Sequence, residues 1–218
     1  KKFKNVSYRT IAKENLHSEE ISNHVAILAK NKKVREIINK FQKKIIKSNK
    51  VECVIHLAAF LGVKVTELDP VKVLEINYNG TKNILEACKN TKVNRFIFSS
   101  SSEIYGDQNK ILKENSIPKP KSFYGFSKWQ AEILVKNFCT QNRINYNILR
   151  FFNVYGPTQN KFFVIPKFID LAKQNKKITL FGNGSQIRSF CFVDDAVEGI
   201  LKIIKNGKKN TVYNIGNN

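Results

Sequence analysis

The chain has 218 residues, of which 42% are hydrophobic, so it is long enough to bury a core, but no apolar run approaches the ~18 residues of a membrane-spanning helix. The formal net charge of +21 comes mainly from scattered lysines rather than from basic residues interleaved with aromatic ones, as a nucleic-acid stacking platform would require. We therefore expect a soluble cytoplasmic protein with no specific nucleic-acid partner and no contact with a membrane.

Strand and helix patterns alternate from residue 51 onward. Residues 33–47 have helical periodicity, whereas residues 1–47 as a whole allow no firm assignment. Short apolar runs typical of buried parallel strands occur at 51–57, 95–98 and 146–150. Between them, Asp69-Pro70 indicates the start of a helix that continues toward Cys88, and a second helix is expected from Tyr124 to about Gln141. This alternation predicts an α/β fold with a doubly wound parallel sheet.

Beyond Arg150 the pattern loosens. We expect a turn-rich exit at 153–157, a helix at 165–173, a strand at 178–181 and a tight turn at 182–185. The Asp194-Asp195 pair should cap a helix that runs to about Ile204, and 212–215 should form a strand. The domain prediction is an incomplete sheet domain over 1–160 and part of a small substrate-binding lobe over 161–218.

The four cysteines lie at least 35 residues apart, without a Cys-x-x-Cys pair, and only three histidines are present. The spacing of zinc ligands is therefore missing, and no metal site is expected. Reduced thiols in a reducing compartment are the natural interpretation.

Tyr124 and Lys128 lie four residues apart near the start of a predicted helix, 23 residues after Ser101 in a run of serines. Residues i and i+4 share a helix face, so we expect the ammonium to favour the phenolate and lower the pKa of Tyr124. Tyr124 could then take a proton from a sugar hydroxyl that Ser101 holds in place. Parallel strands place such groups at their carboxyl ends.

Six motifs together resemble the extended short-chain dehydrogenases/reductases, and more narrowly the nucleotide-sugar epimerase/dehydratase family. The resemblance covers about residues 51–216 and implies a Rossmann-like fold, NAD as cofactor, a nucleotide-diphosphate sugar as substrate and a homodimer formed through the Tyr124 helix. The motifs are Val54–Ala59, Asn77–Thr81 with Leu85–Cys88, Phe98–Gly106, Tyr124–Lys128, Arg150–Pro157 and Phe181–Asp195.

The resemblance also implies roles for single residues. Tyr124 would be the base, Lys128 would hold the cofactor ribose, and Ser101 would orient the reacting hydroxyl, with Glu103 as an additional acid or base. The residues expected to contact the cofactor are Ala58, Ala59, Asn77, Ser99, Tyr124, Lys128 and Phe152. Those expected to contact the substrate are Ser101, Asn153, Phe181 and Arg188, of which Asn153 and Arg188 would hold the diphosphate.

Structural alternatives exist for several of these residues. Phe181 suits the end of a strand in an ordinary core, and Asn153 suits a cap of the turn at Gly156. Asp194 and Asp195 are better explained as a helix cap than as catalytic groups. His56 is expected to pack within its strand.

Two departures from the family pattern bear on activity. The glycine-rich loop G-x-x-G-x-x-G, which binds the cofactor pyrophosphate, is missing, so we expect an inactive fragment whose loop lies upstream of Lys1 or has been disrupted. Sugar 4,6-dehydratases of the family carry an Asp-Glu pair after the catalytic Thr, whereas this chain has Ser102-Glu103, as in UDP-glucuronate decarboxylases and many epimerases. Leu61 replaces a lysine typical of UDP-galactose 4-epimerases.

The function expected from these residues is an NAD-dependent nucleotide-sugar epimerase that oxidises the sugar transiently at C4. A related dehydratase, a decarboxylase that uses Glu103, and a non-catalytic protein that binds nucleotide sugars are the alternatives.

Overall fold

The computed structural model describes residues 32–48, 51–61, 63–108, 110–180 and 182–217. Its main sheet is parallel throughout, which confirms the α/β prediction. In spatial order its strands are β1 (Cys53–His56), β2 (Arg95–Ser101), β3 (Asn145–Phe151) and β6 (Thr211–Ile215). A parallel pair β4 (Asn153–Tyr155) and β5 (Phe190–Phe192) forms a second sheet, in segments for which the sequence predicted no strand.

The expected helices are all present, with ends shifted by at most a few residues. In chain order the helical elements are α3 (Lys32–Ser48), α4 (Val63–Leu68), α5 (Pro70–Leu74), the π-helical turn η1 (Glu75–Asn79), α6 (Gly80–Cys88), the 3-10 helix η2 (Ser102–Tyr105), α7 (Phe123–Gln141), α8 (Val164–Lys173) and α9 (Val193–Asn206).

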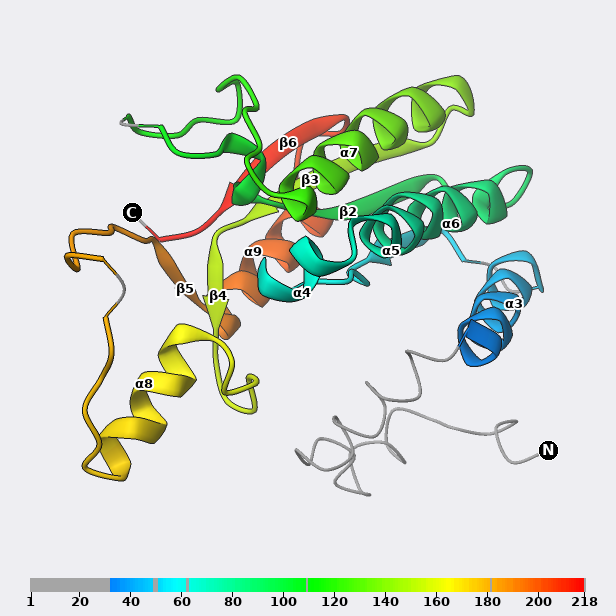
Figure 1. Ribbon diagram of the computed structural model, residues 1–218. Coiled ribbons are helices and arrows are strands. Elements are labelled where there is room, and N and C mark those ends of the chain that lie inside the picture. Colours follow the sequence, from blue (N-terminus) through cyan, green and yellow to red (C-terminus); the bar gives the residue numbers. More distant parts are fainter. Residues whose placement is uncertain (1–31, 49–50, 62, 109, 181, 218) are drawn as a thin grey trace. The chain divides into compact units, whose positions relative to one another are not determined.

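Helices cover both faces of the main sheet, with α6 and α7 on one face and α9 on the other (Figure 1). Strand β2 shows why: Phe96 and Phe98 pack into the core below α6 and α7, whereas Ile97 between them packs toward α9. Successive side chains of a strand point to opposite faces, so a strand that is apolar at every position needs cover on both. This arrangement leaves the ends of the strands as the place for polar groups.

The helical stretch from Pro70 to Cys88 begins as predicted. Asp69 is the N-cap, its side chain accepts a 3.0 Å hydrogen bond from the backbone N–H of Lys72, and Pro70 occupies the first turn. The stretch then widens into the π-helical turn η1 before α6 continues it. Such turns are often found at functional sites, and this one carries Asn77.

Two local predictions are wrong. Residues Ile178–Leu180 form no strand, because these side chains are exposed and no strand among the described residues pairs with them; Phe181 lies outside the described residues. Asp194 and Asp195 do not cap α9, which begins one residue earlier with Phe192 at the N-cap position. Their negative charges lie in the first turn instead, where they interact favourably with the positive end of the helix dipole.

The chain divides into two compact units. The main sheet, the β4–β5 pair and helices α6, α7 and α9 belong to one of them, and α8 belongs to the other. No described helix is long and apolar enough to cross a membrane, and the described residues contain no group of three or more His, Cys, Asp or Glu arranged to hold a metal ion. All four cysteines are free thiols.

Candidate active site

The serine run ends strand β2 at the carboxyl edge of the sheet. Ser101 is the last residue of the strand, and its Oγ accepts a 3.2 Å hydrogen bond from the backbone N–H of Glu103 at the start of η2. Because this bond occupies Oγ as an acceptor, the hydroxyl hydrogen of Ser101 is free to be donated elsewhere. The side chain of Ser101 lies close enough to the phenol of Tyr124 to lower its pKa.

Helix α7 carries Tyr124 and Lys128 toward this edge. Its N-cap is Ser122, whose Oγ accepts a 3.0 Å hydrogen bond from the N–H of Gly125. A Cβ on Gly125 would lie 2.6 Å from the carbonyl oxygen of Glu103, so the glycine allows the start of α7 to approach η2 closely. The sequence Tyr124-Gly125 thereby brings the phenol next to the residues that follow Ser101.

Lys128 is buried below this contact, with 2% of its surface exposed. Its Nζ donates a 2.7 Å hydrogen bond to the carbonyl oxygen of Ser99 and lies 4.9 Å from the centre of the Phe98 ring. Burial lowers the pKa of the ammonium to about 8, while the negative charge of Glu132 opposes the shift. An ammonium carries three donors, so the single bond to Ser99 leaves donors for a ligand.

The pKa of Tyr124 differs from the sequence-based expectation. Burial raises it to about 12, the hydrogen bond with Ser101 lowers it, and the charge of Glu103 raises it further. Lys128 is not among the groups that lower it; its Nζ lies 6.0 Å from the centre of the tyrosine ring and is bonded to Ser99. The expectation that Lys128 lowers this pKa is therefore wrong for this structure, because burial outweighs the effect of a charge at that distance.

Glu103 lies at the solvent-exposed rim beside Tyr124. Its Oε2 accepts a 3.5 Å hydrogen bond from the hydroxyl of Ser122, the residue that caps α7. Its charge raises the pKa of Tyr124, and the residue is exposed to solvent. Geometrically it can serve as a second acid or base.

Asn77 connects the loop after β1 to helix α7. Its side chain exchanges two hydrogen bonds with the backbone of Phe60, at 2.7 Å and 3.0 Å, and its Nδ2 donates a further bond of 3.0 Å to Oγ of Ser127. The loop that Asn77 fixes contains Ala58, which is exposed, and Ala59, which is half-buried. The contacts of Asn77 thus hold a backbone segment beside the strand end.

A buried polar chain extends from this point to His56. The hydroxyl of Thr81 donates to the carbonyl oxygen of Asn77 at 2.6 Å, so the 3.1 Å contact between His56 Nε2 and Thr81 requires Nε2 to be the donor. Burial lowers the pKa of His56 to about 4, and the charge of Lys128 lowers it further. His56 is neutral at pH 7 and stacks on Phe98 of the neighbouring strand β2, so it packs across the sheet rather than only within its own strand.

The remaining predicted residues follow strand β3. Phe152 packs against Gly216 at the end of β6. The Nδ2 of Asn153 donates a 2.9 Å hydrogen bond to the carbonyl oxygen of Ser189, so its side chain joins β4 to the segment before β5 rather than capping the turn at Gly156. Arg188, next to Ser189, is exposed and donates one hydrogen bond, to the carbonyl oxygen of Ile187. The predicted contact of Phe181 lies outside the described residues.

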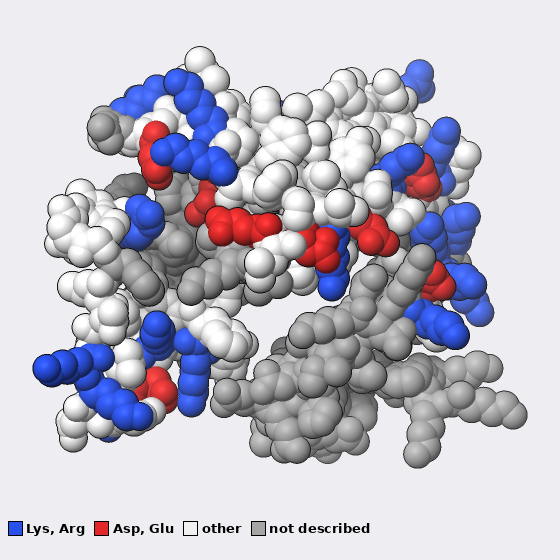
Figure 2. All heavy atoms as spheres, in the orientation of Figure 1, with Lys and Arg blue, Asp and Glu red and all other residues white. Residues whose placement is uncertain are grey.

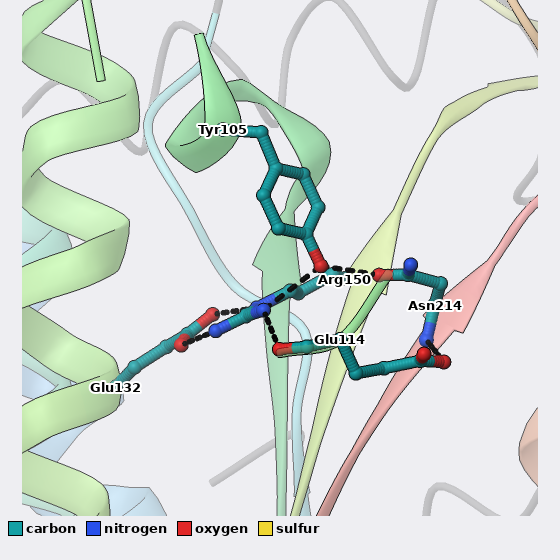
Figure 3. A network of polar contacts seen from close by, with 5 residues as sticks. All are labelled: Tyr105, Glu114, Glu132, Arg150 and Asn214. Atoms are coloured by element: carbon teal, nitrogen blue, oxygen red, sulfur yellow. Dashed lines mark hydrogen bonds and ion pairs between the residues drawn. The ribbon is translucent and has the colours of Figure 1, made fainter. Parts of the chain in front are cut away.

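Sequence reasoning missed a buried ion pair beside the site. Glu132 on α7 and Arg150 on β3 form two parallel hydrogen bonds, and Arg150 also contacts Tyr105 (Figure 3). The spacing of Tyr124, Lys128 and Glu132 at i, i+4 and i+8 is the signal that could have placed Glu132 on the inner face of the helix.

The amino-acid sequence matches a known protein family over most of its length. Residues 11–216 match the model of a family described as "NAD dependent epimerase/dehydratase family". The chain belongs to that family. The motif-based resemblance is thereby confirmed.

Relatives within the family catalyse different reactions. The chain is 38% identical over 184 residues to a dTDP-D-glucose 4,6-dehydratase of Dictyostelium discoideum (79% of this chain, 42% of the relative) and 36% identical over 179 residues to the human dTDP-D-glucose 4,6-dehydratase (82% and 51%). A putative UDP-glucose 4-epimerase of Methanocaldococcus jannaschii is 37% identical over 171 residues (76% and 55%). The chain thus spans about half the length of these curated relatives.

Solved structures of family members share the fold. UDP-glucose 4-epimerase of Thermotoga maritima, solved with UDP-glucose, superposes with a TM-score of 0.77 at 31% identity, covering 82% of this chain and 59% of that one. UDP-glucuronic acid 4-epimerase of Bacillus cereus, in complex with UDP-glucuronic acid and NAD, gives 0.75 at 32% identity, covering 81% and 57%.

Proposed function

We propose that this chain carries the catalytic residues of an NAD-dependent nucleotide-sugar epimerase that acts by transient oxidation at sugar C4. The observation that supports this best is the joining of Ser101, Tyr124 and Lys128 at the carboxyl end of β2. A phenol within reach of a serine hydroxyl, on the same helix as a buried ammonium with donors left over, is suited to moving a proton on and off a sugar hydroxyl.

The described residues fit part of an NAD site. Lys128 has donors left for ribose hydroxyls, and the loop held by Asn77 offers backbone at Ala58 and Ala59 beside the strand end. Ser99 and Phe152 complete the set of residues that we assign to the cofactor. When bound, NAD supplies the two-electron oxidation of the sugar carbon, the return reduction and a positive charge near the phenol.

One element of cofactor binding is not in this sequence. No G-x-x-G-x-x-G occurs in the 218 residues, so the backbone N–H cradle for the pyrophosphate is missing. We therefore expect the 218-residue chain by itself to bind NAD weakly and to be inactive.

The proton transfer is assigned to Tyr124. Its pKa of about 12 must fall for the phenolate to form, and Ser101 can contribute because its hydroxyl hydrogen is free to bond the phenolate oxygen. Tyr124 then accepts the proton of the sugar 4-hydroxyl and returns it when the opposite face of the carbon is reduced. Lys128, bonded to Ser99, does not lower this pKa itself, so we assign it to holding the cofactor rather than to activating the phenol.

The substrate is proposed to be a nucleotide-diphosphate sugar. Arg188 donates a single described hydrogen bond, so most of its guanidinium donors are available to diphosphate oxygens. Asn153 fixes the residue next to Arg188, and we place both beside the diphosphate. Phe181 stays a proposal for the nucleotide base.

A decarboxylase related to those acting on UDP-glucuronate is the second candidate. The exposed carboxylate of Glu103 beside Tyr124 favours it, since loss of a carboxyl group at C5 follows oxidation at C4. The dehydratase alternative lacks the carboxylate that the family pattern places before this glutamate, since Ser102 stands there. A non-catalytic protein that binds nucleotide sugars is favoured only by the missing glycine loop.

We also propose a cytoplasmic homodimer formed through helix α7. The exposed surface of this helix includes Phe123, Phe126 and Ile133. Figure 2 shows few charged side chains over α7. A second copy would bury this apolar surface.

Replacement of Tyr124 by Phe tests the proposed function. In the complete gene product, Tyr124→Phe should lower kcat by roughly 100-fold or more with little change in nucleotide-sugar binding, because general acid–base catalysis contributes at least that much. The control is Tyr146→Phe, which removes a hydroxyl at the opposite end of the sheet. Full activity of Tyr124→Phe would rule out this assignment.

A further inference from the structure

The ion pair between Arg150 and Glu132 is buried between strand β3 and helix α7, the helix that also carries Tyr124 and Lys128 (Figure 3). Arg150 Nε lies 3.0 Å from Glu132 Oε1 and Nη2 lies 2.8 Å from Oε2, so both carboxylate oxygens are engaged. The two side chains are 4% and 1% exposed. A two-bond arginine–carboxylate contact fixes direction as well as distance, so it sets how α7 lies against β3.

Arg150 also binds the segment that follows the catalytic serine. Its Nη1 donates hydrogen bonds of 2.8 Å to the hydroxyl of Tyr105 and to the carbonyl oxygen of Glu114. Tyr105 ends η2, four residues after Ser101, and its hydroxyl donates a 2.7 Å bond to Asn214 Oδ1 on β6. One guanidinium therefore connects the helix that carries Tyr124 with the segment that begins at Ser101.

Glu132 lies one helical turn after Lys128, and both side chains are buried. Opposite charges at i and i+4 commonly pair directly along a helix. Here they do not: Glu132 is bonded to Arg150, and the ammonium of Lys128 is bonded to the carbonyl oxygen of Ser99. The other titratable groups around the ammonium are His56 on β1, which is neutral at pH 7, and Tyr124.

We propose that Arg150 and Glu132 are positioning residues of the candidate active site. Arg150 occupies both oxygens of Glu132, so that Lys128 stays directed at the end of β2 instead of pairing along its own helix, and it ties α7 to the segment after Ser101. The role of Lys128 as a cofactor-binding residue rests on the proposed function. The contacts among Arg150, Glu132 and Lys128 can be tested without substrate or cofactor.

The test is an NMR titration of isotope-labelled lysine side chains in the 218-residue chain. The pKa of Lys128 is about 8, whereas that of an exposed lysine is ~10.4, so the two kinds of lysine titrate at different pH. The resonance that disappears in Lys128→Arg is the one that belongs to Lys128. In Glu132→Gln, which keeps the shape and removes the charge, the midpoint should fall below about 8 because a favourable charge is lost. In Arg150→Met it should rise, because the freed carboxylate pairs with Lys128.

Glu198→Gln is the matched control, since it removes the acidic member of an exposed i, i+4 pair with Lys202 on α9 and should leave the Lys128 midpoint unchanged. An unchanged midpoint in both Glu132→Gln and Arg150→Met would show a merely structural pair and overturn the proposal. A fall in Arg150→Met would also overturn it, because Glu132 would then have taken up a proton instead of pairing.

Folding failure of a single variant does not prevent the test. The double variant Arg150→Met with Glu132→Leu removes both charges, and a midpoint below that of the wild type supports the proposal whereas an unchanged one contradicts it. Failure of the proposed function would appear differently: the complete protein would not bind NAD while the Lys128 midpoint still responded to these substitutions.

Discussion

The two ends of the main sheet each contain an arginine network, and the two networks differ in what they hold. At the amino end, Arg95 donates to the side-chain oxygen of Asn147 and to the carbonyl oxygens of Ile203 and Ile204. These carbonyls belong to the last turn of α9. Arg95 therefore supplies hydrogen-bond donors to carbonyl groups at the end of the helix, and its positive charge interacts favourably with the negative end of the helix dipole. At the carboxyl end, Arg150 is bonded to a carboxylate and to segments around Ser101 and Tyr124.

The polar side chains described at the amino end are engaged in hydrogen bonds within the fold, whereas some of those at the carboxyl end keep hydrogen-bonding groups that a ligand could use. Asn147 accepts from Arg95 and donates to two carbonyl oxygens, so its amide is fully engaged. Lys128 has donors left over, and the side chain of Ser100 is buried without a hydrogen-bond partner among the described residues. From this difference we expect substitutions at the amino end to change stability alone, and those at the carboxyl end to change stability and chemistry.

The largest effect is expected from Arg150→Met. Removal of the guanidinium takes away both bonds to the buried Glu132 carboxylate, and pairing with Lys128 compensates only in part, so the free energy of unfolding should fall by at most about 3–5 kcal/mol. Adding Glu132→Leu should recover most of the loss, because an apolar pair of similar volume avoids the desolvation cost. Urea unfolding of both variants measures this, and a double variant no more stable than Arg150→Met would contradict it.

Acid should weaken the carboxyl end through His56. Its pKa is lowered from 6.5 to about 4, so the unfolded chain binds a proton between those pH values that the folded chain does not. Stability should therefore fall as the pH decreases from about 6.5 to about 4, by up to about 3 kcal/mol from this group. Unfolding free energies of the wild type and His56→Gln across that range should converge toward pH 4; parallel curves would exclude His56 as the cause.

At the amino end, Arg95→Met should cost about 1–3 kcal/mol, because the carbonyls of Ile203 and Ile204 and the amide of Asn147 lose a partner. We expect this change to appear in thermal unfolding and to leave the Lys128 titration untouched. If Arg95→Met moved the Lys128 midpoint, the two ends of the sheet would be coupled and the comparison between them would fail.

An effect of at most the same size is expected from Gly125→Ala. The added Cβ would lie 2.6 Å from the Glu103 carbonyl oxygen, so α7 must shift away from η2 at a cost of about 1–3 kcal/mol. The contact between Ser101 and Tyr124 should loosen with it. Gly80→Ala on α6 is the control, because its Cβ meets nothing within 4 Å, and it should be neutral or stabilising by up to about 1 kcal/mol. Calorimetry of both variants measures the contrast, which equal melting temperatures would contradict.

Local chemistry explains which parts of the fold could be predicted. The cap at Asp69 and the buried strand patterns at 95–98 and 146–150 depend on a few adjacent residues, and the structure confirms them. The pattern at 178–181 looked similar, but a strand also needs a neighbour, which no local pattern supplies.

The same limit applies to the candidate site. Tyr124, Lys128 and Ser101 were placed together because helix periodicity and strand-end topology are regular. The pKa of Tyr124 was predicted in the wrong direction because burial depends on the whole surrounding structure. The pair of Glu132 and Arg150 was missed because a charged residue on a helix is usually solvated, and its partner lies 18 residues away on a strand.

The measurement that tests the central claim most directly is the NAD content of the purified complete gene product, followed by the absorbance of reduced nicotinamide after nucleotide sugar is added. The account predicts bound NAD in the wild type and in Tyr124→Phe, with reduced nicotinamide formed during turnover in the wild type alone. Absence of NAD from both proteins, or equal reduction in both, would contradict the claim that the carboxyl end of β2 is a nucleotide-sugar oxidation site.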